Sequence, residues 1–293
     1  MMNKNILLKF KRETIALLSK IRLRKFSTNY LGKKFDIPVV YGIVNGGYVV
    51  PAEFWMGDCL RAFVTTKGGC VIDVGVNVGL YLVKLKCISE DIEYIGFEPN
   101  PSCNLYTQEL IRLNRFENTR VFPLALSDTA GVSRFYASEI GDKTGSLIEA
   151  HKVNEAMEYA MDVYTTSGDD VIDLLGLKEI SVIKVDVEEA EVYVLKGLDG
   201  TIRKYRPYLY CEILFANDDA DRIDRIRSIY RQITNCEYVI LGIKNDTKEL
   251  YVVDSVDELG VMFGQEYVFC PVEIMGEFLD AISVNSSNIK FVS

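Results

Sequence analysis

Charged side chains alternate along one otherwise apolar stretch, and their types suit proton transfer. In IKVDVE, residues 183–188, Lys184, Asp186 and Glu188 occupy every second position, so a strand here places them on one face. Open α/β sheets bind ligands at the carboxyl ends of their strands, where a carboxylate can remove a proton from an attacking hydroxyl. We therefore predict Asp186 and Glu188 as catalytic residues. The alternative is an ion pair between Lys184 and a carboxylate that stabilises the strand end.

Other groups could also act as a base or a ligand. His151 is the only histidine and is a further candidate base, although a lone histidine in a polar stretch is more often a surface residue. Glu191 follows Glu188 by one helical turn and either joins the site or caps the helix. Asp186, Glu188 and Glu212 could bind a divalent cation, but their spacing does not require one, and we expect no metal.

A glycine turn follows an apolar run in VIDVGVNVGLYL, residues 71–82. A dinucleotide fingerprint needs G-x-G-x-x-G, and after Gly75 the two later glycine positions hold Asn77 and Leu80. Asp73 at the end of the expected strand would repel a pyrophosphate and attract an ammonium or sulfonium group. The turn therefore favours a cationic, phosphate-free ligand over a dinucleotide, unless Asp73 only caps the turn.

A second acid suits the sugar of such a ligand. Glu98 ends the next expected strand, where dinucleotide folds also place an acid that accepts hydrogen bonds from ribose hydroxyls. S-adenosylmethionine has this ribose, carries both an ammonium and a sulfonium group, and has no phosphate. The alternative is that Glu98, which precedes Pro99, is an exposed turn residue.

Four motifs in this order, VIDVGVNVG, YIGFEPNP, ALSD and IKVDVEEAE, resemble the FkbM family of S-adenosylmethionine-dependent methyltransferases, which have the class I fold. The resemblance covers roughly residues 70–212. It implies that the glycine turn surrounds the methionine part of the cofactor, that the second motif holds the ribose, and that Ala125 to Asp128 lie against the adenine. The residues so assigned to cofactor binding are Asp73, Gly75, Asn77, Gly79, Glu98, Pro99, Ser127 and Asp128. Without the resemblance, Ser127-Asp128 is ordinary turn chemistry.

One position departs from the family pattern. The family usually reads D-V-E-G-A-E after the fourth strand, and Glu189 stands where the glycine is expected. The added carboxylate could crowd the substrate side or extend into solvent. It leaves the substrate and the level of activity open.

Short apolar runs alternate with helical patterns around these motifs, which predicts a parallel sheet with helices on both faces. The expected strands are 71–75, 93–98, 119–126, 181–187 and 208–214, and the expected helices are 79–88, 102–114, 189–204 and 218–232. Strands 237–243 and 249–253, joined by a tight turn, predict an antiparallel hairpin at the sheet edge. The resemblance implies that this hairpin completes a seven-stranded, mostly parallel sheet. The fold class is thus α/β, a Rossmann-like class I methyltransferase with an N-terminal helical extension.

The N-terminal segment differs in composition from the rest. Up to Lys25 its charges are almost all basic, with apolar residues at roughly helical spacing, so it predicts a basic amphipathic helix that lies on an anionic membrane or packs on the domain or a second subunit. We place a basic helix and a strand and helix lead-in at 1–67 and an S-adenosylmethionine-binding methyltransferase domain at 68–293.

Overall charge and cysteine usage narrow the partners and the compartment. A net charge of -9 argues against general nucleic-acid binding. Seven scattered cysteines without a CxxC pair, and the lack of a spanning segment or a cleavable signal, favour the cytoplasm.

These observations together predict an S-adenosylmethionine-dependent methyltransferase. The resemblance alone implies the acceptor, a hydroxyl of a sugar, glycan precursor or secondary metabolite. Two rivals remain. One is a nucleotide-dependent oxidoreductase, which Asp73, Asn77 and Leu80 disfavour; the other is a cofactor-binding module with little turnover.

Overall fold

The computed structural model of the chain describes residues 24–40, 54–137, 144–149, 159–215, 219–244, 247–260, 265–285 and 289–291. Two predicted features lie outside these residues: the basic helix before Lys25 and the candidate base His151. The predicted contact of the basic helix with a membrane or a second subunit therefore stays a prediction.

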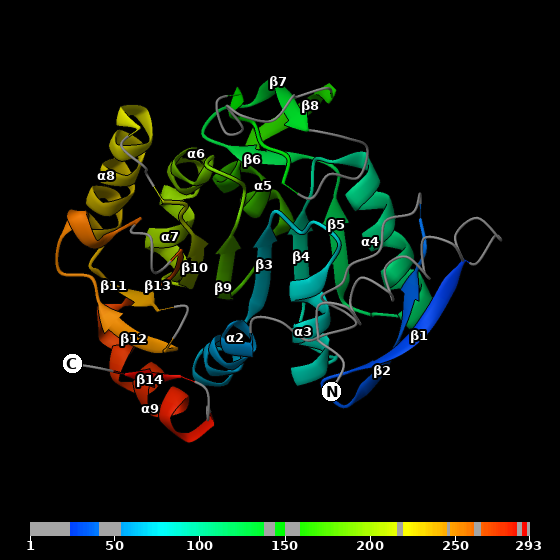
Figure 1. The fold of residues 1–293 in the computed structure, drawn as a ribbon, viewed down its shortest axis with the longest axis horizontal. Helices are drawn as coiled ribbons and strands as arrows, with labels where there is room; N and C mark the ends of the chain where they lie inside the picture. The colour runs from blue at the N-terminus through cyan, green and yellow to red at the C-terminus, as the bar shows by residue number, and fades with distance from the viewer. Residues whose placement is uncertain are drawn as a thin grey trace, which may run out of the picture.

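A central sheet organises the molecule (Figure 1). Within the described residues it has nine strands in the order β14-β12-β11-β13-β10-β9-β3-β4-β5. Strands β5, β4, β3, β9 and β10 run parallel, whereas β13 is antiparallel to both β10 and β11. The strands are β3 (Cys70–Val74), β4 (Tyr94–Phe97), β5 (Thr119–Phe122), β9 (Ile180–Val185), β10 (Tyr208–Glu212), β11 (Tyr238–Ile243), β12 (Glu249–Val252), β13 (Glu266–Pro271) and β14 (Lys290–Phe291).

The predicted seven strands are therefore too few. The antiparallel pairing of β11 with β12 is confirmed, but β13 separates this hairpin from β10 and β14 extends the sheet beyond β12. The predicted strands did not include β13, and its place between β10 and β11 is set by pairing with strands far away along the chain.

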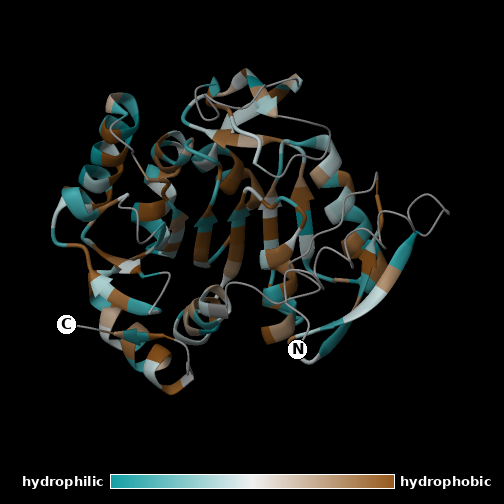
Figure 2. Cartoon of the chain, viewed as in Figure 1, coloured by the Kyte–Doolittle hydropathy of each residue, from teal (hydrophilic) through white to brown (hydrophobic). Residues whose placement is uncertain are grey.

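Helices cover both faces because neighbouring residues of each strand point to opposite sides. Ile72 packs in the cluster formed with α5 (Gly168–Leu175), α6 (Glu191–Gly197), α7 (Asp199–Tyr205) and α8 (Ala220–Asn235), whereas Val71 packs with α2 (Phe54–Thr66), α3 (Leu80–Ile88) and α9 (Met275–Asn285). Figure 2 shows the central strands in the brown of apolar residues. Short 3-10 helices occupy Val256–Glu258 and Val272–Ile274.

The N-terminal part adds two further contacts. The hairpin of β1 (Lys25–Tyr30) and β2 (Lys33–Pro38) packs against α4 (Pro101–Asn114). Helix α2, which lies before the predicted domain boundary at residue 68, contributes Leu60 and Phe63 to a core shared with the sheet. Among the described helices, none is both long and apolar enough to cross a bilayer.

Two predicted elements are each divided. Residues 119–126 form β5 and then β6 (Ala125–Ser127), which leaves the central sheet after Pro123. Residues 189–204 form α6 and α7, which meet at Leu198. At Gly197 just before this break, a Cβ atom would lie 1.9 Å from the carbonyl oxygen of Ser127, so the close approach of β6 requires glycine there.

A small second sheet has the order β6-β8-β7, with β7 at Gly131–Ala137 and β8 at Tyr159–Ser167. Figure 1 shows it above the ends to which the arrows of β3 and β4 point. The carboxyl ends of the central strands therefore lie beneath a covering layer.

Candidate active site

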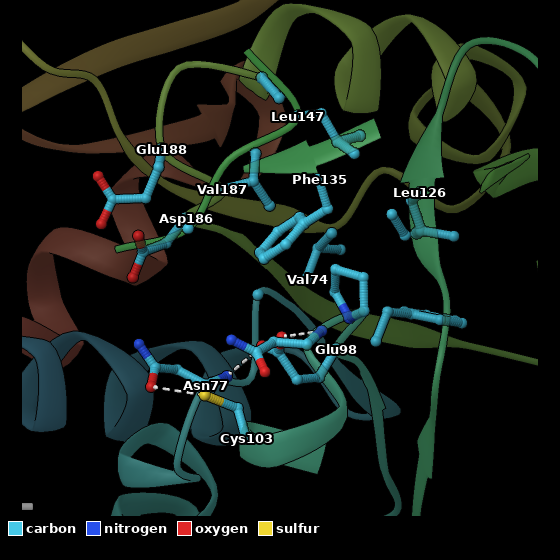
Figure 3. Close-up of a pocket in the computed structure, with 17 residues that line it drawn as sticks. Val74, Asn77, Glu98, Cys103, Leu126, Phe135, Leu147, Asp186, Val187 and Glu188 are labelled. Carbon is cyan, nitrogen blue, oxygen red and sulfur yellow. Dashed lines mark hydrogen bonds between the residues drawn. The ribbon is translucent and has the colours of Figure 1, made fainter. Parts of the chain in front are cut away.

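A cavity of about 600 Å³ that is partly open to solvent lies between the central sheet and this covering layer. Its walls come from the ends of β3, β4 and β9, from α4, and from β6, β7 and residues 145–147. In Figure 3, Asp186 and Glu188 lie on one side, Asn77, Glu98 and Cys103 below, and Phe135 and Leu147 above.

The glycine turn after β3 forms part of the floor. Gly75 has a φ of 85°, and a Cβ atom there would lie 1.9 Å from the carbonyl oxygen of Asp186. Asn77 is also left-handed, with a φ of 55°, and its carbonyl accepts a hydrogen bond from the Thr107 hydroxyl at 2.9 Å. Gly79, with a φ of 80°, is the N-cap residue of α3. Gly75 and Asn77 line the cavity, whereas Gly79 does not.

Glu98 lies in the cavity wall just after β4. Its carboxylate accepts hydrogen bonds from the backbone N–H of Asn77 at 2.6 Å and of Asn100 at 2.8 Å. Only 5% of the residue is exposed, and burial raises the pKa of Glu98 to about 7, against the opposing effect of these two N–H groups. The carboxylate is thus fixed in position, and its remaining lone pairs can accept hydrogen bonds from a ligand diol.

Asp73 is placed differently from the expectation that it lies beside the ligand. It is fully buried and is not among the residues that line the cavity. Its carboxylate accepts hydrogen bonds from Lys184 at 3.0 Å and from the Tyr94 hydroxyl. Burial raises the pKa of Asp73, and Lys184 and Tyr94 offset only part of this effect.

Lys184 of β9 connects this strand to the end of β3 beside the cavity. Its ammonium donates to the carbonyl oxygen of Gly75 at 2.9 Å and forms ion pairs with Asp73 at 3.0 Å and Asp186 at 3.2 Å. Burial alone would lower the pKa of Lys184, but these two carboxylates outweigh it and raise the pKa. The ion pair that the sequence left as an alternative is therefore present, and it fixes the strand ends on which the cavity is built.

The predicted catalytic carboxylates lie together at the end of β9. Asp186 and Glu188 both line the cavity, and the side chain of Asp186 is 33% exposed. Glu212, at the end of the neighbouring β10, forms a hydrogen bond to Asp186; burial, followed by repulsion from Asp186, raises the pKa of Glu212 well above its usual range. Among the described residues, no group of three or more histidine, cysteine or acidic side chains is arranged to hold a metal ion.

The turn that carries these carboxylates is strained. Glu188 and Glu189 have φ values of 56° and 79°, a region that costs residues other than glycine about 1–2 kcal/mol each. The hydroxyl of Ser146 donates to the carbonyl oxygen of Glu188. The Glu191 carboxylate accepts from the backbone N–H of Val187 at 3.3 Å and of Glu189 at 3.1 Å, so Glu191 caps the turn, and burial raises its pKa to about 8.

Glu189 takes neither of the two positions expected from the sequence. It neither lines the main cavity nor extends into solvent, since its side chain is 3% exposed and forms ion pairs with Arg222 and Arg225 of α8.

Only part of the segment that was expected to lie against an adenine lines the cavity. Ala125 and Leu126 of β6 line the cavity, whereas Ser127 and Asp128 do not. Pro99 does line it. The predicted roles in cofactor binding stay predictions for all of these residues.

Several lining residues are not among those predicted. Phe135, Gly145 and Leu147 close the cavity from the covering layer. They belong to a stretch whose sequence is irregular, and the glycines of GDKTGS, residues 141–146, were the only local signal. A Cβ atom at Gly145 would lie 2.5 Å from the Phe135 ring, which explains the need for glycine.

The donor set of the cavity fits S-adenosylmethionine. An apolar wall of Phe97, Ala125 and Leu126 adjoins the fixed carboxylate of Glu98, which is the pairing that an adenine ring and a ribose diol need. The described lining contains acidic residues and no lysine or arginine, and therefore offers no charge partner to a phosphate.

The fold and the cavity define an α/β protein with a cavity at the carboxyl ends of its parallel strands. Residues 73–240, more than half of the chain, match the Methyltransferase FkbM domain. The chain therefore belongs to the FkbM methyltransferase family.

Three relatives show how far the likeness extends. "Methyltransferase 1" of Beauveria bassiana is 23% identical over 201 residues, covering 63% of this chain and 77% of its own length. "Hexuronic acid methyltransferase AglP" of Haloferax volcanii is 33% identical over 134 residues, 45% of this chain and 50% of its own. "2-O-methyltransferase NoeI" of Sinorhizobium fredii is 27% identical over 155 residues, 48% of this chain and 62% of its own. The chain thus spans less than two thirds of the length of the last two relatives.

Proposed function

We propose that this protein is an S-adenosylmethionine-dependent O-methyltransferase that acts on a hydroxyl of a sugar or a related hydroxylated compound. The observation that carries the proposal is the division of the cavity: the fixed carboxylate of Glu98 lies beside an apolar wall, and Asp186 and Glu188 lie on another side. The first part suits an adenosine and the second an acceptor that must lose a proton.

The chain's own residues have separate tasks in this proposal. S-adenosylmethionine, when bound, would supply a methyl group on a sulfonium centre, for which a neutral thioether is the leaving group. Glu98 accepts hydrogen bonds from the ribose diol and fixes the position of the cofactor. Phe135 and Leu147 cover the cavity and exclude water, which favours an in-line displacement.

Asp186 is the proposed general base. With S-adenosylmethionine bound as the methyl donor, the Asp186 carboxylate would accept the proton of the acceptor hydroxyl and pass it to solvent through its exposed part. Lys184 at 3.2 Å holds this carboxylate in position, while Glu188 on the same turn accepts hydrogen bonds from neighbouring hydroxyls of the acceptor. Such a base contributes about 10² to 10⁴-fold to the rate.

The acceptor class draws support from the relatives. The names of two of them specify a hexuronic acid methyltransferase and a 2-O-methyltransferase. Carboxylates at the wall of the cavity can also accept hydrogen bonds from the hydroxyls of a saccharide.

Calorimetric titration with S-adenosylhomocysteine and with NAD tests the cofactor. We expect binding of S-adenosylhomocysteine alone, and its loss in Glu98→Ala. Release of S-adenosylhomocysteine from S-adenosylmethionine in the presence of neutral sugars, amino sugars and uronic acids then tests the reaction. Binding without release from any acceptor would favour a cofactor-binding module, and binding of NAD alone would favour an oxidoreductase.

A further inference from the structure

The turn between β9 and α6 adopts a backbone shape that suits glycine better than the residue it holds. Glu189 has a φ of 79° and follows Glu188, which is also left-handed. Side chains disfavour this region, and such strain persists only where the surroundings hold it in place.

The Glu189 carboxylate is bound by two arginines of α8. It accepts hydrogen bonds from Nε of Arg222 at 3.0 Å, from Nη2 of Arg222, and from Nη2 of Arg225 at 2.6 Å. Charge-assisted, two-pronged pairs of this kind fix both distance and direction. Arg222 also donates from Nη1 to the carbonyl oxygen of Phe215 at 2.6 Å, so one guanidinium joins the turn to the connection between β10 and α8.

The two sides of the turn face different surroundings. Asp186 and Glu188 line the main cavity, whereas Glu189, Arg222 and Arg225 line a separate cavity of about 250 Å³ at α8. From the covering layer, Ser146 donates to the carbonyl oxygen of Glu188. The turn is thus held between the covering layer and α8, with the carboxylates of Asp186 and Glu188 on the side of the active site.

We propose that Glu189 is a positioning residue: its bonds to Arg222 and Arg225 hold the strained turn so that Asp186 and Glu188 face the acceptor. This inference rests on the proposed function, because it takes Asp186 and Glu188 to be the acceptor side. It gives the carboxylate that replaces the family's usual glycine a task that glycine cannot perform, a fixed connection between the acceptor side and α8.

Five variants test the proposal together with the wild type. Glu189→Gly removes the carboxylate and tolerates the backbone shape, the double variant Arg222→Ala with Arg225→Ala removes its partners, and a triple variant removes both. Arg227→Ala is the control, because Arg227 lies on the same helix in an exposed pair with Asp224 at 3.2 Å. Glu189→Gln, which retains the shape and one acceptor oxygen, is the conservative replacement.

Three properties are measured for each folded variant. They are hydrogen exchange at the amides of residues 187–190, the dissociation constant for S-adenosylhomocysteine, and kcat and KM with an acceptor found among the neutral sugars, amino sugars and uronic acids. We expect faster exchange and a kcat lower by about 10- to 100-fold in Glu189→Gly and in the arginine double variant. The triple variant should be no worse than either, because all three lose the same connection. Binding of S-adenosylhomocysteine should change much less, Glu189→Gln should recover part of kcat, and Arg227→Ala should match the wild type.

The outcomes separate this inference from the function on which it rests. A wild type that neither binds S-adenosylhomocysteine nor releases it with any acceptor overturns the proposed function. A wild type that does both, with variants that lose thermal stability but keep wild-type exchange at 187–190 and wild-type kcat, overturns the positioning role and leaves the function standing. Additive losses in the triple variant would also contradict a shared connection.

Discussion

Lys184 lies directly opposite Asp73 on the neighbouring parallel strand, and the two side chains form a buried ion pair at 3.0 Å. Because Lys184 also binds Asp186 and the carbonyl oxygen of Gly75, Asp73 influences the cavity through Lys184 and the glycine turn. The acid of the first motif is therefore connected to both predicted parts of the site without lining either.

Removal of Asp73 should cost stability. Asp73→Asn leaves Lys184 buried with fewer charge partners, so we expect a loss on the order of 3 kcal/mol in the free energy of unfolding, measured by urea denaturation. Asp73→Asn combined with Lys184→Met should recover much of it, since no buried charge then remains beside Tyr94. Arg203→Ala, which breaks an exposed pair with Asp199, should cost much less stability, because solvent screens exposed ion pairs. Equal losses in the two single variants would contradict the importance of the buried pair.

Glu98 should make stability depend on pH. Its pKa is raised from 4.5 to about 7 in the folded protein, so folding favours the protonated carboxyl, and stability falls as the pH rises from about 4.5 to 7. Over this window the difference in unfolding free energy between wild type and Glu98→Gln should change by on the order of 3 kcal/mol, in the direction that disfavours wild type at high pH. Urea titrations at several pH values measure it, and parallel curves for the two proteins would refute the raised pKa.

The same group should give ligand binding the opposite pH dependence. A ribose diol donates to the ionised carboxylate, so S-adenosylhomocysteine should bind more weakly as the pH falls through about 7, and the pH dependence should disappear in Glu98→Gln. Calorimetry at matched ionic strength measures both proteins. Binding that is independent of pH in the wild type would speak against Glu98 as the ribose acceptor.

Gly75 should not tolerate a side chain. Gly75→Ala adds a methyl group 1.9 Å from the carbonyl oxygen of Asp186 at a φ of 85°, so we expect a loss of about 3 kcal/mol in stability and of S-adenosylhomocysteine binding. Gly57→Ala is the matched control, because this helical glycine in α2 has no atom within 4 Å of the added carbon. It should gain about 0.5–1 kcal/mol, as thermal and urea unfolding would show.

Replacement of Asp186 should affect the rate of the reaction but not the binding of the cofactor. Asp186→Asn should lower kcat by about 10²- to 10⁴-fold while S-adenosylhomocysteine still binds. Glu188→Gln should affect mainly KM for the acceptor if its side chain only accepts hydrogen bonds. Steady-state kcat and KM of both variants, with an acceptor found among the sugars tested, measure the difference. A larger loss of kcat in Glu188→Gln than in Asp186→Asn would exchange the two roles.

The parts of the site that the sequence indicated are those set by local chain geometry. The glycine turn, Glu98 at the end of its strand, and the alternation of Lys184 with Asp186 all follow from spacing within a few residues. The ion pair between Lys184 and a carboxylate was one of two possibilities, but its partner Asp73 depends on strand register, which local spacing does not reveal.

What the sequence missed depends on distant segments. Phe135 and Leu147 reach the cavity only because β7 and residues 144–149 lie over the sheet, and the orientation of Glu189 depends on arginines more than 30 positions later. Strand β13 likewise pairs with β10 and β11, and pairing partners are not written into the strand itself.

The place of β13 has a consequence for synthesis of the chain. Strand β13 lies between β10 and β11, yet it follows both along the chain. A ribosome therefore releases these two neighbours before β13 itself. Until residues 266–271 emerge, β10 and β11 each present an unpaired edge open to other chains. The protein thus depends on its C-terminal segment to complete the middle of its sheet, and nascent chains that stop before this segment should aggregate.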